Sequence, residues 1–139
     1  MNSAIIYATK TGHSKKIAEK IADAMNLTAM NVAQNPRMEQ IDLLYIVGGI
    51  YGGKSLPQLL DFIQTLDNIN VKKVVLMTSC VSGKSKQNEV REILSNKAIE
   101  VMEDEFVCPG KFLFLKAKHP DQEDISQAIA FAKEQGGAI

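Results

Sequence analysis

Short apolar runs alternate with segments of helical periodicity along most of the chain, and this alternation predicts the secondary structure. Ala4–Ala8, Leu43–Val47 and Val74–Met77 are continuously apolar, which is typical of strands buried on both faces of a sheet. We predict a less marked strand at Leu27–Val32 and an edge strand at Ile99–Phe106, where four acidic residues are interspersed. The pattern therefore predicts about five strands.

The segments between these runs have the spacing of amphipathic helices. The first predicted helix buries a stripe of residues at positions 17, 18, 21, 22 and 25 and exposes a charged face. A second helix has Ser55 as its predicted N-cap and Pro57 in its first turn, and a third surrounds Val90–Leu94. The pattern also predicts a short helix at Met38–Ile41.

The last predicted helix opens at Asp121, with Asp124 as its capping-box partner, and ends at Gly136-Gly137. Strands that alternate with helices of this length pair in parallel through right-handed crossovers. We therefore expect a single domain over residues 1–139, with a doubly wound, three-layer α/β fold and a five-stranded parallel sheet.

Ligands of such folds bind at the carboxyl ends of the strands, which directs attention to the loops Thr9–Ser14, Gly48–Ser55 and Thr78–Ser85. The first loop leads directly into a helix, where backbone N–H groups and the helix dipole form an anion site. Its hydroxyl groups add donors without fixed charge, which suits a phosphate monoester. An ordinary N-cap rich in Ser and Thr is the alternative interpretation.

The second loop contains the pattern G-x-x-x-x-G-K-S between a predicted strand and a predicted helix, which matches a nucleotide-binding P-loop. A P-loop nucleotide-binding protein is therefore a rival interpretation. Three observations count against it: no later strand ends in the Asp that the magnesium site needs, Pro57 occupies the first turn of the next helix, and the motif follows the third strand.

Thr9-x-Thr11-Gly12-x-Ser14, placed after a first buried strand, resembles the FMN-phosphate loop of the flavodoxin family, in which the pattern is T/S-x-T-G-x-T. The resemblance extends to the order of elements along the chain and implies a short-chain flavodoxin-like protein that binds FMN non-covalently. It assigns the phosphate to Thr9, Lys10, Thr11, Gly12, His13 and Ser14. It assigns the isoalloxazine ring to Gly49, Ile50, Tyr51, Gly52 and Gly53 of the second loop and to Ser79, Cys80, Val81 and Gly83 of the third.

The same resemblance implies that Tyr51 covers one face of the flavin and that the Gly52-Gly53 peptide can turn a carbonyl toward the flavin N5, which favours one-electron steps. A half-buried aromatic that closes a strand end is the alternative interpretation of Tyr51. The third loop holds no aromatic residue, whereas many flavodoxins stack a tyrosine there. One flavin face is therefore expected to be open, or covered only by Cys80 and Val81.

Sixteen Lys and Arg residues balance sixteen Asp and Glu residues, so the formal net charge is zero. This balance gives no signature of nucleic-acid binding and departs from typical flavodoxins, which are strongly acidic. We expect neither a signal peptide nor a membrane span. The two cysteines, Cys80 and Cys108, suit a reducing cytoplasm and exclude a disulfide framework or a zinc site.

Together these features predict an FMN-binding electron carrier that delivers reducing equivalents to a partner reductase or oxidase. The apolar and basic segment from Cys108 to His119 is a candidate docking surface, with a solvated charge run as the alternative. A second hypothesis is a flavodoxin-like oxidoreductase that acts directly on a quinone or a tetrapyrrole such as bilirubin. The chain is similar in size to the flavodoxin-like accessory proteins of bacterial bilirubin reductase. A flavin-free interaction module is a further alternative.

Overall fold

The computed structural model describes residues 1–10, 12–51, 53–79, 86–107 and 122–137. A central parallel sheet has the strand order β2-β1-β3-β6-β7, which confirms the predicted five-stranded architecture. A short sixth strand, β8, also pairs in parallel with β6. The strands are β1 (Ser3–Tyr7), β2 (Ala29–Asn31), β3 (Ile41–Gly48), β6 (Val71–Thr78), β7 (Glu100–Val101) and β8 (Phe106–Val107).

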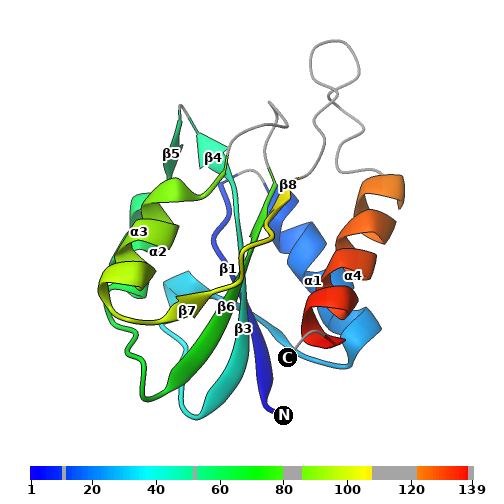
Figure 1. Ribbon diagram of the computed structural model, residues 1–139. Coiled ribbons are helices and arrows are strands. Elements are labelled where there is room, and N and C mark those ends of the chain that lie inside the picture. The colour runs from blue at the N-terminus through cyan, green and yellow to red at the C-terminus, as the bar shows by residue number, and fades with distance from the viewer. Residues whose placement is uncertain (11, 52, 80–85, 108–121, 138–139) are drawn as a thin grey trace.

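Helices lie on both faces of the sheet and complete three layers (Figure 1). One face is covered by α1 (His13–Met25) and α4 (Gln122–Gly137), and the other by α2 (Pro57–Ile63) and α3 (Asn88–Asn96). This is the doubly wound α/β arrangement that the alternation of strands and helices predicts. No helix in the described ranges is long and apolar enough to cross a membrane.

Side chains of the central strands pack alternately into the two helical layers, because successive residues of a strand point to opposite faces. In β1, Ile5 and Tyr7 pack on the side of α1 and α4, whereas Ala4 and Ile6 pack on the side of α2 and α3. Both faces of the sheet are therefore apolar, which explains the continuous apolar sequences of its strands. The predicted inner stripe of α1 is also buried, at positions 17, 18, 21 and 22.

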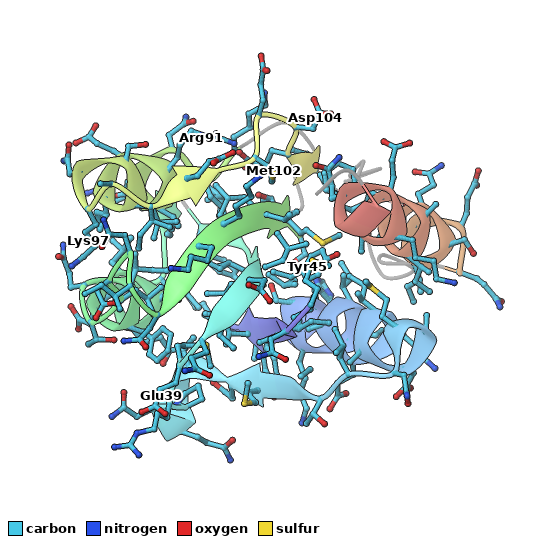
Figure 2. All side chains as sticks on the ribbon, turned by 60° about the horizontal axis from the view of Figure 1, so that its bottom comes forward. Glu39, Tyr45, Arg91, Lys97, Met102 and Asp104 are labelled. Carbon is cyan, nitrogen blue, oxygen red and sulfur yellow. The ribbon has the colours of Figure 1, made fainter. Side chains whose placement is uncertain are left out.

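Tyr45 of β3 is one of the largest fully buried side chains and lies between the sheet and the layer of α1 and α4 (Figure 2). Its hydroxyl donates a hydrogen bond of 2.7 Å to the carbonyl oxygen of Ala132 in α4. Burial raises the pKa of the Tyr45 phenol to about 12, because the phenolate would lose its hydration. The phenol therefore stays neutral, and its hydrogen bond links α4 to the centre of the sheet.

The chain between β2 and β3 differs from the predicted helix at Met38–Ile41. It contains instead a 3-10 turn, η1 (Val32–Gln34), followed by irregular structure up to β3. Gln40 has a φ of 53°, a left-handed conformation that no α-helix contains. Ile41 donates its N–H to the carbonyl oxygen of Asn70 and enters the sheet beside β6. Pairing with β6 therefore places Ile41, which the local pattern assigned to a helix, in β3.

The predictions that Ser55 caps α2 and that Ile99–Phe106 is one strand are also wrong. Residues 50–55 form an antiparallel hairpin of β4 (Ile50–Tyr51) and β5 (Lys54–Ser55), so the N-cap of α2 is Leu56. Pro57 opens α2 as predicted. The edge segment is interrupted after β7 and resumes as β8, and the Glu105 side chain between the two strands is 1% exposed.

Candidate functional site

The loops that follow β1, β3 and β6 lie at one edge of the sheet, because these three strands are parallel neighbours. Ser79, directly after β6, donates its N–H to the carbonyl oxygen of Gly48 at 2.9 Å. Its hydroxyl oxygen lies 2.6 Å from that of Ser14, in the first turn of α1. Hydrogen bonds therefore join described parts of all three predicted loops.

Gly12 and Thr9 shape the first loop. Gly12 has a φ of 92°, a conformation that favours glycine, and it is the N-cap residue of α1. Its N–H donates a hydrogen bond of 2.8 Å to Thr9 Oγ1. Because this N-cap provides no side-chain hydrogen bond, the amides at the start of α1 keep their positive electrostatic potential for an anion.

The two residues that begin α1 have different surroundings. His13 is half-buried, whereas Ser14 is fully buried with its hydroxyl directed at Ser79. Only one of the two hydroxyl hydrogens of the Ser14–Ser79 pair can lie between the oxygens. The other hydrogen is therefore free to reach a further acceptor at the edge of the sheet.

Gly49 and Tyr51 pack closely in the second loop. A Cβ atom at Gly49 would lie 2.7 Å from the Tyr51 hydroxyl oxygen and 2.8 Å from the Ser79 carbonyl oxygen, so only glycine fits there. Lys10 Nζ lies 5.5 Å from the centroid of the Tyr51 ring, a cation–π contact between the first and second loops. Tyr51 of the predicted ring side thus contacts Lys10 of the predicted phosphate side.

The hairpin of β4 and β5 does not have the geometry of a P-loop. In a P-loop the Lys and the following Ser or Thr open the phosphate-binding helix, whereas Lys54 and Ser55 pair here with Tyr51 and Ile50 across the hairpin. Lys54 is exposed, and the Ser55 N–H donates a hydrogen bond of 2.9 Å to the Glu89 carboxylate of α3. The arrangement counts against the nucleotide-binding interpretation.

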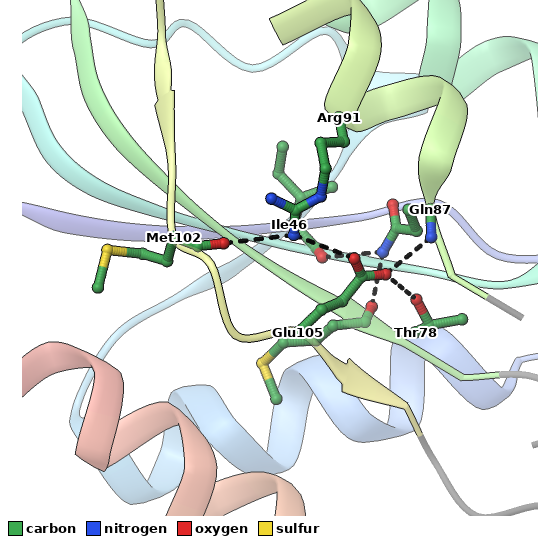
Figure 3. Close-up of polar contacts among 7 residues, drawn as sticks. Ile46, Thr78, Gln87, Arg91, Met102 and Glu105 are labelled. Atoms are coloured by element: carbon green, nitrogen blue, oxygen red, sulfur yellow. Dashed lines mark hydrogen bonds and ion pairs between the residues drawn. The ribbon is translucent and has the colours of Figure 1, made fainter. Parts of the chain in front are cut away.

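A buried polar network that the sequence did not predict links the end of β6 to the start of α3 (Figure 3). Glu105 Oε2 accepts hydrogen bonds from the Gln87 N–H at 2.7 Å and from Thr78 Oγ1 at 3.2 Å. Glu105 Oε1 forms an ion pair of 3.2 Å with Arg91 Nη2, which also donates to the Met102 carbonyl oxygen. The acidic residues of Ile99–Phe106 are the one feature of the sequence that points to this network, but their pattern is typical of an exposed edge strand.

Gln87, the residue before α3, is fully buried and belongs to the same network. Its Nε2 donates hydrogen bonds to the carbonyl oxygens of Met77 at 2.9 Å and Ile46 at 3.4 Å. A single side chain therefore attaches the start of α3 to both β6 and β3. The sequence pattern gave no reason to expect a buried amide at this position.

Five predicted site residues lie outside the described residues: Thr11, Gly52, Cys80, Val81 and Gly83. The candidate docking segment from Cys108 to His119 and the predicted helix start at Asp121 lie outside them as well. The roles of these residues stay predictions. In the part of the chain that the structure describes, no group of three His, Cys, Asp or Glu side chains could hold a metal ion.

Comparisons with known proteins agree with this architecture. A family model described as a flavodoxin domain matches residues 4–119. An uncharacterized protein of Methanocaldococcus jannaschii is 30% identical over 148 residues, which cover 96% of this chain and 97% of that protein. Oxidised flavodoxin 2 from Bacillus cereus is 18% identical, with a TM-score of 0.71 over 100% of both chains. A short-chain flavodoxin associated with a non-canonical PDU bacterial microcompartment is 19% identical, with a TM-score of 0.70 over 96% of this chain and 95% of its own.

Proposed function

Because this chain belongs to the flavodoxin domain family, we propose that it binds FMN non-covalently and carries electrons to a partner protein. The observation that best supports this function is the convergence of three loops through Ser14, Ser79 and Gly48. FMN needs an anion site for its phosphate and a slot for its flat ring. In this proposal the first loop supplies the anion site, and the second and third loops supply the slot.

The described residues of the first loop fit a phosphate monoester. The N-cap of α1 leaves its amides facing the loop, and the first turn contains no acidic residue that would repel an anion. Lys10 is an exposed residue of the loop and adds one positive charge. The hydroxyls of Thr9 and of the Ser14–Ser79 pair supply neutral donors. We assign the phosphate to this set together with Thr11, Gly12 and His13.

The second loop fits the flavin ring in composition and exposure. Tyr51 is half-buried and offers apolar surface that excludes water from one side of the ring, and the neighbouring Ile50 is buried in the protein. Gly49 brings backbone close to Ser79, which allows peptide groups of two loops to face the ring edge. FMN supplies the redox chemistry when bound, because it accepts and releases electrons. The protein then binds it, orients it and shields it.

We propose that electrons pass to a reductase or an oxidase through direct contact between proteins. The formal net charge is zero, so long-range electrostatic steering contributes little and docking depends on local contacts. A cytoplasmic location suits this role, because the two cysteines have 27 residues between them and require no oxidising compartment.

The spectrum of the purified protein tests FMN binding. We expect a yellow protein whose flavin is released on denaturation and identified as FMN by chromatography. The apoprotein should recover the flavin spectrum with FMN and should not bind ATP in the presence of magnesium. An apoprotein that takes up no FMN would contradict the proposal, and magnesium-dependent ATP binding would favour the P-loop interpretation.

An oxidoreductase that acts directly on a quinone or a tetrapyrrole such as bilirubin is the second candidate. The observation in its favour is the third loop, Thr78–Ser85, whose sequence contains no aromatic residue that could cover the outer flavin face. Anaerobic reduction of the FMN-loaded protein, followed by mixing with a quinone or with bilirubin, separates the two functions. Rapid reoxidation with multiple turnover would favour the enzyme, whereas slow reoxidation would favour the carrier.

A further inference from the structure

The Glu105 carboxylate joins the two ends of the third loop. Thr78 is the last residue of β6 and Gln87 directly precedes α3, so the loop lies between them. Both donate to the same oxygen, Oε2, at 3.2 Å and 2.7 Å. The Glu105 side chain is 1% exposed. One buried oxygen atom therefore holds together the base of the loop (Figure 3).

The same network also reaches the second loop. Gln87 donates from Nε2 to Ile46 and Met77, which are near the carboxyl ends of β3 and β6. A Cβ atom at Gly48 would lie 3.4 Å from Gln87 Oε1, so this side chain packs against the start of the second loop. The bond from the Ser79 N–H to the Gly48 carbonyl oxygen completes the link. One set of contacts therefore links Thr78 and Gln87 to the start of the second loop at Gly48.

Simple packing does not require a charge at this position. Well-packed apolar residues of the same volume often stabilise a fold as well as a buried ion pair does. Glu105 nevertheless has three donors on its two oxygens: the Gln87 N–H, the Thr78 hydroxyl and Arg91 Nη2. Directional hydrogen bonds to a buried carboxylate fix the positions of its donors more narrowly than apolar contacts do. Such a network at the ligand edge of the sheet points to a role in shaping the site.

We propose that Glu105 is a positioning residue for the flavin ring. It acts through Thr78 and Gln87, whose separation it sets, and so determines where Ser79, which follows Thr78 and is bonded to Gly48, lies on the ring side of the site. Glu105 needs no contact with the flavin, and its effect belongs to the ring side of the site rather than the phosphate side. This inference rests on the proposed FMN-binding function.

Glu105→Gln tests the role with little change in size. The new amide can lie in two orientations. If its oxygen accepts from Thr78 and Gln87, its NH₂ group faces Arg91, which is also a donor. If the amide is rotated by 180°, the NH₂ group faces the Gln87 N–H. In either orientation, one pair of hydrogen-bond donors therefore faces each other without an acceptor. We expect the dissociation constant of FMN to rise about tenfold or more. The dissociation constant of riboflavin, which lacks the phosphate, should rise by the same factor. The ratio of the two dissociation constants should therefore stay at its wild-type value.

A double variant supplies a rescue that identifies the mechanism. Glu105→Gln with Arg91→Met removes the opposing donor, so the amide oxygen can again accept from Thr78 and Gln87 without any charge. FMN affinity should return to within about threefold of wild type. Glu100→Gln is the matched control, because Glu100 is an exposed residue of neighbouring β7 whose ion pair with Lys73 of β6 lies outside this network. This control should leave FMN and riboflavin affinity unchanged.

Thr78→Val tests the same link if Glu105→Gln does not fold. It keeps the branched shape and removes one of the two donors to Oε2, and we expect a rise of about threefold to tenfold in both dissociation constants. Wild-type affinities in the folded variants would overturn the inference, even if urea unfolding showed lower stability. Weaker binding of FMN with unchanged binding of riboflavin would also overturn the inference, because that result would place the effect at the phosphate. If the wild-type protein binds no flavin, the proposed function fails, and this inference fails with it.

Discussion

The hydroxyl oxygens of Ser14 and Ser79 lie 2.6 Å apart, although 65 positions separate the two residues in the chain. Ser14 stands in the first turn of α1, beside the proposed phosphate loop, and Ser79 directly follows β6, beside the proposed ring site. Both residues are buried. A single hydrogen bond therefore connects the two halves of the proposed FMN site.

Ser79→Ala removes this connection while keeping the backbone hydrogen bond to Gly48. The variant leaves the buried Ser14 hydroxyl without its partner, a change that costs about 1–3 kcal/mol when such a group is unsatisfied. We expect FMN affinity of the apoprotein to fall by about fivefold to a hundredfold. Ser95→Ala, at an exposed position of α3, is the control and should bind FMN as the wild type does. Equal affinity of both variants would show that the hydroxyl pair makes no contribution.

Lys54→Ala distinguishes the hairpin from a P-loop. Lys54 is exposed on β5, and the removal of an exposed charge changes binding energy by less than about 1 kcal/mol. FMN affinity should therefore stay within about threefold of wild type. Loss of a magnesium-dependent ATP affinity in this variant would contradict the assignment of the loop.

Gly53→Ala tests the left-handed turn at the tip of the hairpin. Gly53 has a φ of 80°, which an alanine adopts at a cost of about 1–2 kcal/mol. Urea unfolding of the apoprotein should show a loss of stability of about that size if the hairpin keeps its conformation. Gly137→Ala, at the end of α4 where a Cβ atom would meet open space, should cause no such loss. Equal stability of the two variants would argue against the turn.

Tyr45→Phe tests the attachment of α4 to the sheet. The change removes the 2.7 Å hydrogen bond to Ala132 and leaves the ring in place. We expect the free energy of unfolding at neutral pH to fall by about 1 kcal/mol. Urea unfolding measures this loss, and a variant as stable as the wild type would contradict the stabilising role of the bond.

The same tyrosine predicts a loss of stability at high pH. Burial raises its pKa in the folded protein to about 12, whereas a tyrosine in the unfolded chain ionises near pH 10 (about 10 in model peptides). Between these values the unfolded state loses the proton first, so stability falls as pH rises. The Tyr45 contribution is complete below about pH 10 and is lost by about pH 12. Tyr45→Phe should reduce this slope, as unfolding curves across that range would show.

The elements that could be predicted from sequence are those whose burial is nearly uniform. Ala4–Ala8 and Leu43–Val47 lie in or at the ends of strands buried on both faces, so their apolar runs predicted β1 and β3 directly. The spacing of Ile17 and Ile21 likewise predicted the buried face of α1. The position of the candidate site followed from the topology, because the carboxyl ends of neighbouring parallel strands meet.

The features that the sequence did not predict depend on contacts between distant residues. Ser55 has the composition of an N-cap, but pairing with Ile50 draws it into a hairpin. Ile41 fits a helical pattern, but hydrogen bonding to Asn70 places it in β3. Glu105 looks like an exposed edge residue, and only its approach to Arg91 and Gln87 in the folded chain reveals a buried carboxylate.

Titration of the apoprotein with FMN and with riboflavin, side by side, tests most directly whether the first loop is a phosphate site. A charged phosphate held by several donors contributes roughly 1.5–3 kcal/mol for each strong hydrogen bond. We therefore predict that FMN binds at least about tenfold more tightly than riboflavin. Thr9→Val, which removes the hydroxyl that orders Gly12, should reduce that ratio. Equal affinity for FMN and riboflavin in the wild-type protein would contradict the assignment of the site.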